Sequence, residues 1–179
     1  MKKIILINIF LICLSLVVSS NSKPGKLDSL TTFFLVRHAE KVSDGSFDPD
    51  LTAAGSARAD ELAYILRYVD LDAIYSTPFQ RTKQTAMPTA REKGLDLELY
   101  DPSDKGFLKK VLHSHPGGTV LIVGHSNTIP GMVNELAGKP DFSDLDDDTY
   151  DNLFIACVPA EGEPVILQMR YGVHTPKKE

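Results

Sequence analysis

Short apolar runs alternate with amphipathic segments along most of this chain. Runs that stay apolar at successive positions are typical of strands buried on both sides of a sheet. Such strands are predicted over residues 31–36 and 119–123. Further strands are predicted over residues 72–75, 153–158 and 165–170, and over residues 95–100, where apolar and polar residues alternate. Helical spacing of apolar positions, together with residues that end helices, predicts helices over residues 52–69, 80–93, 104–113 and 129–137. The alternation predicts an α/β fold, a three-layer sandwich with a mostly parallel central sheet and helices on both faces.

Residue types at the helix ends support these boundaries. Thr52 and Asp104 are candidate N-caps, because their short side chains can accept hydrogen bonds from the free N–H groups of a first turn. Gly94 and Gly138 follow the second and fourth helices, where a left-handed residue often ends a helix. The acidic stretch 141–151 is predicted to be a solvated loop whose charge needs no ligand.

The first residues form a segment apart from the fold. Lys2 and Lys3 precede an apolar run over residues 4–18, and small polar residues follow it. This order is typical of a secretory signal peptide. A bilayer span needs about 20 apolar residues. The run is shorter, so a lasting membrane anchor is not expected.

The rest of the chain is predicted to be one domain. The expected boundaries are a signal peptide at 1–20, a linker at 21–30 and a single domain at 31–179. Removal of the signal near Ser20 predicts a periplasmic or secreted protein without stable membrane insertion. Cys13 offers the alternative of a lipid anchor, although Ile12 is bulky where a lipoprotein signal usually carries a small residue.

Composition and net charge limit the classes of partner that this chain is expected to bind. The 179 residues, 42% of them hydrophobic, suffice for one domain with a core. The net charge is −5 and no long basic run is present, so nucleic acid is not an expected partner. Cys157 would be the one cysteine left after signal removal, so no internal disulfide is expected. Cys157 is predicted to be a small buried thiol.

Two histidines follow predicted strands at matching places. His38 comes after the strand that ends at Val36, and His125 comes after the strand that ends at Val123. Because ligands of open α/β sheets bind beyond the carboxyl ends of the strands, both imidazoles could meet at one edge. On this spacing alone, a functional site and a pair of structural histidines both remain open.

Four segments, in order, match one known family. They read Leu-Val-Arg-His-Ala-Glu at 35–40, Leu-Thr-Ala-Ala-Gly at 51–55, Ser-Thr-Pro-Phe-Gln-Arg-Thr-Lys-Gln-Thr-Ala at 76–86 and Gly-His-Ser-Asn-Thr at 124–128. Together they resemble the histidine phosphatase superfamily, which includes the phosphoglycerate mutases. The chain departs from the family pattern at Ala39, where glycine is common, and at Thr77, which interrupts the more usual Ser-Pro pair.

The resemblance implies a role for each basic residue. His38 would attack phosphorus through one ring nitrogen, which requires a neutral imidazole whose other nitrogen donates to an acceptor such as a backbone carbonyl. Arg37 and Arg81 would grip the phosphoryl oxygens, because a guanidinium offers a fork of donors. His125 would donate to the same oxygens as charge spreads over them in the transition state.

A phosphatase also needs an acid for the leaving oxygen and a base for water. In much of the family a carboxylate after the second helix does this, and the matching stretch here runs over 99–104. Asp101 is the first candidate and Asp104 the second, with helix capping as a sufficient alternative for Asp104. Glu40 is interpreted as a residue that orders the loop after His38 by hydrogen-bonding backbone.

The expected activity is hydrolysis of a phosphomonoester, a small phosphorylated metabolite or an envelope sugar phosphate, through phosphohistidine. No cofactor and no catalytic metal are expected, because the sequence lacks a His-Glu-x-x-His pattern. The other three histidines receive structural interpretations: His113 and His115 at a helix end and His174 in a polar tail. Three alternatives remain: a phosphohistidine protein phosphatase, a phosphoglycerate mutase-type phosphotransferase and a non-catalytic phosphate-binding protein. No oligomeric state is predicted.

Overall fold

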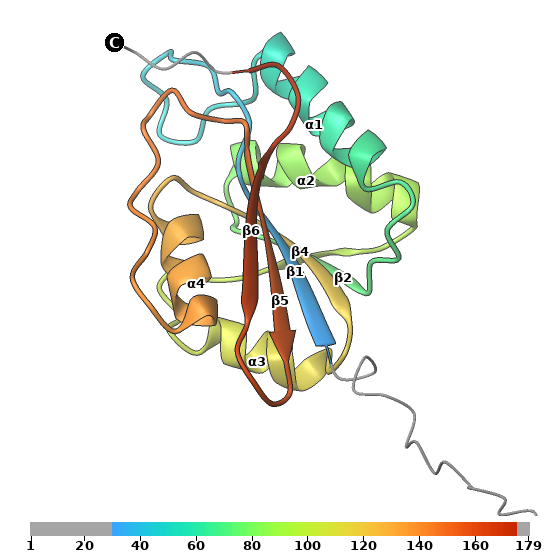
Figure 1. The fold of residues 1–179 in the computed structure, drawn as a ribbon. Helices are drawn as coiled ribbons and strands as arrows, with labels where there is room; N and C mark the ends of the chain where they lie inside the picture. The colour runs from blue at the N-terminus through green and yellow to red at the C-terminus, as the bar shows by residue number, and fades with distance from the viewer. Residues whose placement is uncertain (1–29, 175–179) are drawn as a thin grey trace, which may run out of the picture.

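The computed structural model describes residues 30–174 (Figure 1). The predicted signal peptide, the question of a lipid anchor at Cys13 and all but the last residue of the predicted linker lie outside this part. Within the part that is described, no helix is long and apolar enough to cross a membrane.

A single six-stranded sheet forms the centre of the fold (Figure 1). Its strands are β1 Leu30–Arg37, β2 Ala73–Ser76, β3 Leu97–Leu99, β4 Thr119–Gly124, β5 Asn152–Pro159 and β6 Val165–Arg170. They lie in the order β3-β2-β4-β1-β5-β6. Strands β1 to β4 are mutually parallel, and β5 pairs antiparallel with both β1 and β6. The prediction of a mostly parallel sheet is therefore confirmed.

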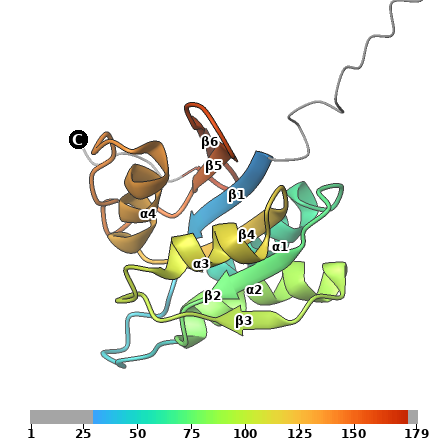
Figure 2. The same cartoon turned by 90° about the horizontal axis from the view of Figure 1, so that it is seen from below.

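Four helices cover the two faces of the sheet (Figure 2). They are α1 Ala53–Ile65, α2 Gln80–Lys93, α3 Phe107–Ser114 and α4 Thr128–Ala137. Buried residues of α1 and α2 pack on one face, and those of α3 and α4 pack on the other. The three-layer sandwich predicted from the sequence is confirmed.

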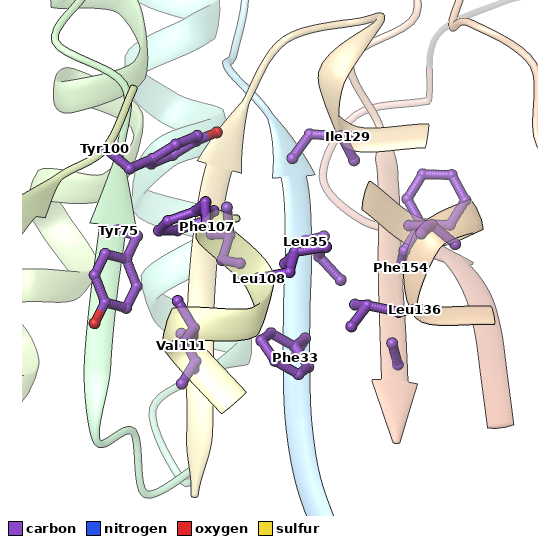
Figure 3. Close-up of a cluster of buried hydrophobic side chains, with 14 of the residues drawn as sticks. Phe33, Leu35, Tyr75, Tyr100, Phe107, Leu108, Val111, Ile129, Leu136 and Phe154 are labelled. Atoms are coloured by element: carbon purple, nitrogen blue, oxygen red, sulfur yellow. The ribbon is translucent and has the colours of Figure 1, made fainter. Parts of the chain in front are cut away.

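Packing of hydrophobic side chains in the core fixes the position of β1. Figure 3 shows Leu108 and Val111 of α3 packed with Phe33 and Leu35 of β1. Burying such a side chain contributes about 1.5–3 kcal/mol. Phe33 and Leu35 have no exposed surface, so β1 has a single register that keeps this face inward. The carboxyl end of β1 is therefore held in one place.

The helix-end predictions hold at three of four positions. The Thr52 hydroxyl accepts a hydrogen bond from the Gly55 N–H at 3.0 Å, and Gly94 and Gly138 end α2 and α4 with positive φ. The predicted cap at Asp104 is wrong, because α3 begins only at Phe107 and Gly106 is its N-cap. The Asp104 carboxylate instead accepts from the Gly106 N–H in the preceding turn and pairs with Lys110.

Cys157 differs from its prediction as well. It is half-buried on β5 rather than fully buried. It faces Val165 of β6, which is 56% exposed, so this end of the sheet face is only partly covered.

Candidate active site

Sheet topology brings the two strand-end histidines together. Strands β1 and β4 are parallel neighbours, with Arg37 opposite Gly124 in register. His38 and His125 therefore leave the same edge of the sheet side by side, and their ring centroids lie 5.6 Å apart. This is the edge at which open α/β sheets bind ligands.

His38 is held in one orientation by the backbone. Its Nδ1 lies 2.8 Å from the carbonyl oxygen of Ala39, which can only accept, so Nδ1 carries the proton. The Nε2 atom then has a free lone pair. Burial, aided by the nearby charges of Arg37 and Arg81, lowers the pKa of His38 to about 3. The geometry supplies the backbone acceptor and the neutral ring that a nucleophilic histidine requires.

His125 sits against the Thr77 hydroxyl. Its Nε2 lies 3.0 Å from Oγ1 of Thr77, which is fully buried. Burial, followed by the charges of Arg81 and Arg37, lowers the pKa of His125 to about 4. Thr77 was noted in the sequence only as a departure from the family pattern. In the structure it is the side chain that orients His125.

These lowered pKa values predict how the site responds to acid. Between about pH 6.5 and pH 3 the unfolded chain binds protons at His38 that the folded chain does not, so folding stability falls as the pH drops through this window. We expect the His38 and His125 rings to stay neutral at pH 5. Ring carbon–proton chemical shifts, titrated beside a histidine in an unstructured peptide, measure this. Midpoints equal to those of the peptide would contradict burial as the dominant effect.

Arg37 and Arg81 complete a positive cluster around the two rings. The Arg37 side chain is buried, and that of Arg81 is 15% exposed with Nη1 3.6 Å from Asp48 Oδ1. The Nε atoms of both arginines are buried and have no hydrogen-bond partner among the described residues. Buried donors of this kind are costly unless an acceptor meets them. A phosphoryl group would supply such acceptors in the matching geometry.

The cluster lines an open pocket of about 520 Å³. The lining residues are Arg37, His38, Lys41, Phe79, Arg81, Pro102, Ser103, His125, Ser126, Asn127, Thr128 and Asp147. Four of the five residues assigned to the site from sequence are therefore brought together, Asp101 being the exception. Lys41, Phe79 and Asp147 were missed, because each lies outside the four matched segments or carries no signal of its own.

The candidate acids do not line this pocket. Asp101 is exposed, and its carboxylate accepts hydrogen bonds from both the amide and the hydroxyl of Ser103. These bonds lower its pKa. Its neighbours Pro102 and Ser103 do line the pocket, so Asp101 lies at the rim with its carboxylate turned to Ser103. The Asp104 carboxylate forms an ion pair with Lys110.

Glu40 accepts a backbone hydrogen bond, as expected, and has a side-chain partner as well. Its carboxylate accepts hydrogen bonds from the Arg58 side chain, from Nη2 to Oε1 at 2.7 Å and from Nε to Oε2 at 3.0 Å. Burial raises the pKa of Glu40, but the hydrogen bonds from Arg58 and from the backbone, together with the charge of Arg58, outweigh it and the net shift is downward. Arg58 also donates to the carbonyls of Tyr171 and Val173. Through Arg58, Glu40 thus connects the loop after His38 to α1 and to residues 171–173.

The acidic stretch is more than a solvated loop. The Arg37 Nη1 donates to the backbone carbonyls of Asp146 and Thr149, at 2.8 and 3.0 Å. Asp151 is fully buried and pairs with Arg170 and His174. The interpretation of residues 141–151 as a purely solvated loop is therefore wrong, because backbone oxygens and Asp151 hold it against the site and against β6.

The remaining histidines and possible metal ligands lie elsewhere. His115 caps the C-terminal end of α3, as expected, and its Nε2 lies 3.0 Å from the Tyr75 hydroxyl. His174 is more than part of a polar tail, since it contacts Asp151. Among residues 30–174, no group of three or more His, Cys, Asp or Glu side chains could hold a metal ion.

Comparison with known proteins shows which family part of this chain resembles. Residues 33–102 match the family model of the histidine phosphatase superfamily, branch 1. Over this segment the chain is similar to that superfamily. It is 39% identical over 74 residues to phosphoserine phosphatase 1 of Hydrogenobacter thermophilus, covering 38% of this chain and 35% of the relative. It is 33% identical over 91 residues to a probable phosphatase of Schizosaccharomyces pombe, covering 47% of this chain and 32% of the relative. The matches thus span about one third of each relative's length.

Solved structures extend the likeness to most of the fold. The protein histidine phosphatase SixA complexed with tungstate superposes with a TM-score of 0.64 at 20% identity, covering 78% of this chain and 96% of that one. A mutant phosphoserine phosphatase of Entamoeba histolytica in complex with phosphoserine gives 0.60 at 17% identity, covering 76% and 94%. At these identities the likeness concerns the fold alone. It extends well beyond the 33–102 segment that the family model matches.

Proposed function

We propose that this protein is a phosphomonoester hydrolase that works through a phosphohistidine on His38. The observation that carries the proposal is the hydrogen bond between His38 Nδ1 and the Ala39 carbonyl, which leaves Nε2 with its lone pair. Burial keeps the ring neutral. Arg37, Arg81 and His125 surround the position that a phosphoryl group attacked by Nε2 would occupy.

The reaction proceeds in two displacements. The Nε2 lone pair attacks phosphorus, the bond between phosphorus and the ester oxygen breaks, and the leaving oxygen takes a proton to depart as an alcohol. Water then attacks the phosphorus of phosphohistidine and loses a proton. The N–P bond breaks, inorganic phosphate leaves and His38 returns to its neutral form.

The protein itself supplies the positive charge for this transfer. The two guanidinium groups stay charged at any physiological pH and match phosphoryl oxygens as forks of donors. Such fixed donors stabilise charge that spreads over the equatorial oxygens in the transition state. We therefore propose that no metal ion takes part.

Phosphate release by the purified domain tests the function. A panel of small phosphomonoesters, with phosphoserine included because of the relative in Hydrogenobacter thermophilus, should contain substrates. Chelation with EDTA should leave the rate unchanged, whereas vanadate should inhibit by occupying the arginine cluster. No release from any ester would favour the non-catalytic phosphate-binding alternative. Activity lost in EDTA and restored by a divalent ion would contradict the metal-free reaction.

For the substrate, we propose a small phosphorylated metabolite, since the pocket of about 520 Å³ is of the size that holds small molecules. The mutase-type alternative predicts transfer of the phosphoryl group to a second hydroxyl of the substrate instead of to water. Isotope-labelled phosphate recovered only as the free ion would favour hydrolysis. A phosphohistidine protein substrate would appear as release from a phosphorylated protein and from none of the metabolites.

Asp101 remains the proposed proton donor, although the role requires its carboxylate to exchange Ser103 for the leaving oxygen. Asp101→Asn should then slow alkyl phosphates by about 10²–10⁴-fold. It should slow p-nitrophenyl phosphate much less, because that leaving group needs little protonation. Steady-state rates with both substrate types measure the difference.

Two matched variants decide the assignment of the acid. Asp147→Asn removes a carboxylate that lines the pocket, and Asp104→Asn removes one that pairs with Lys110. A defect that depends on the leaving group in Asp147→Asn alone would move the role there. Equal slowing of both substrate types by Asp101→Asn would indicate a binding defect rather than proton transfer.

We also propose that the mature protein is exported, on the charged and apolar pattern of its first 22 residues. Mass spectrometry of the N-terminus in fractionated native cells tests this. A start near Asn21 outside the cytoplasm is expected. An intact Met1 in the cytoplasmic fraction would contradict export.

A further inference from the structure

A ten-residue segment outside the matched family region holds Arg37 in place. We call this segment, residues 142–151, the strap. Its backbone provides two carbonyl acceptors for Arg37 Nη1, from Asp146 and Thr149. The ring of Tyr150 covers the guanidinium, with the Arg37 Cζ 4.4 Å from the ring centroid. One edge and one face of the guanidinium are thereby fixed.

The strap is tied down along its whole length. At its start, the side chain of Asn134 in α4 makes two hydrogen bonds to the backbone of Phe142. Further on, the Leu145 N–H donates to the carbonyl of Ser126, next to His125. At its end the Asp151 carbonyl accepts from the Tyr171 N–H, and its buried carboxylate pairs with Arg170. A segment anchored at three points can hold a side chain rigidly.

The Tyr150 ring lies near both the arginine and the proposed nucleophile. Its ring centroid is 6.1 Å from that of His38, at an angle of 52° between the planes. A cation over an aromatic face is attracted to it, and planar stacking also restricts the guanidinium to one plane. The Nε of Arg37 is buried without a partner among the described residues, and Arg37 lines the pocket.

We propose that Tyr150 is a positioning residue: its ring, carried by the strap, fixes the plane of the Arg37 guanidinium so that the unused donors face the phosphoryl group. This inference rests on the proposed function and adds to it the element that orients the phosphate-binding arginine. Tyr150 acts through Arg37 and forms no bond to phosphorus itself. Misplacing a positioned group by as little as about 1 Å can cost about 10²-fold in rate.

The test compares Tyr150→Leu with Tyr150→Phe. Loss of the ring in Tyr150→Leu should weaken binding of orthovanadate, measured by calorimetry, and lower kcat/KM by about tenfold. Tyr150→Phe keeps the ring and should retain most of both. Tyr68→Leu is the matched control, since Tyr68 is 88% exposed and pairs with Arg67 on the surface in the same manner, at 5.1 Å. It should change neither quantity.

A double-mutant cycle separates positioning from a general loss of structure. If Tyr150 acts through Arg37, Tyr150→Leu should cost little further vanadate affinity in the Arg37→Lys background. Equal losses in both backgrounds, or wild-type affinity and rate in Tyr150→Leu, would overturn the inference while leaving the proposed function intact. A wild-type protein that neither binds vanadate nor releases phosphate would overturn the proposed function, and this inference with it.

Discussion

Replacing His38 with Ala is expected to abolish turnover, lowering kcat by at least about 10⁴-fold. The reason is that no other described side chain at the sheet edge combines a free Nε2 with a ring held by a backbone carbonyl. Wild-type protein mixed with a labelled phosphomonoester should also acquire phosphate that is labile in acid and stable in base. Rapid quenching at high and low pH measures both properties.

His113→Ala serves as the control for this experiment. His113 is exposed in the last turn of α3 and lies away from the pocket lining. Its removal should leave both turnover and labelling at the wild-type level. Full activity in the His38→Ala variant would contradict the mechanism, because no second nucleophile is proposed.

The second large effect is expected at Gly55. Gly55 lies in the first turn of α1, where an added Cβ would overlap the carbonyl oxygen of Glu40, a backbone atom two residues from His38. Gly55→Ala must therefore push the loop after His38 away from α1. We expect a loss of about 1–3 kcal/mol in the free energy of unfolding, the usual cost of overpacking. We also expect kcat to fall by more than the smaller fraction of folded protein would explain.

Gly131→Ala is the matched control for Gly55→Ala. Gly131 also lies within a helix, α4, but nothing stands within 4 Å of its added Cβ. This change should be neutral or should stabilise the protein by up to about 1 kcal/mol, because alanine loses less backbone entropy in a helix. Urea unfolding of both variants gives the comparison. Equal stability in the two would show that the contact with Glu40 relaxes freely.

Local signals predicted the framework of the site well. The buried strand ahead of Arg37 and His38, the strand ahead of His125 and the bounds of α2 at Gln80–Lys93 are confirmed by the structure. Each of these predictions depends on a few neighbouring residues whose pattern fits only one type of local structure. The rule that parallel strands end at one edge then brings His38 and His125 together without any coordinates.

The contacts that hold the site could not be predicted in the same way. The Asp146 and Thr149 carbonyls that bind Arg37 belong to the backbone, so no residue type reveals them. The pairing of Glu40 with Arg58 depends on how α1 lies over the loop after His38. The predicted cap at Asp104 fails because an extra turn over 101–106 delays the helix, and a capping residue type alone does not set that delay.

The position of β1 in the sheet also determines at what stage of protein synthesis the site can assemble. Among the described strands β1 is synthesised first, yet its neighbours in the sheet are β4 and β5, with Thr32 opposite Thr119 and Phe34 opposite Ile155. Pairings so distant along the chain form late, because the intervening residues must first be available. Until residues 119–125 and 142–151 have been synthesised, His38 lacks His125 beside it and Arg37 lacks its carbonyl acceptors. A ribosome-bound chain that still lacks the strap and β5 is therefore expected to have no assembled site at this edge of the sheet.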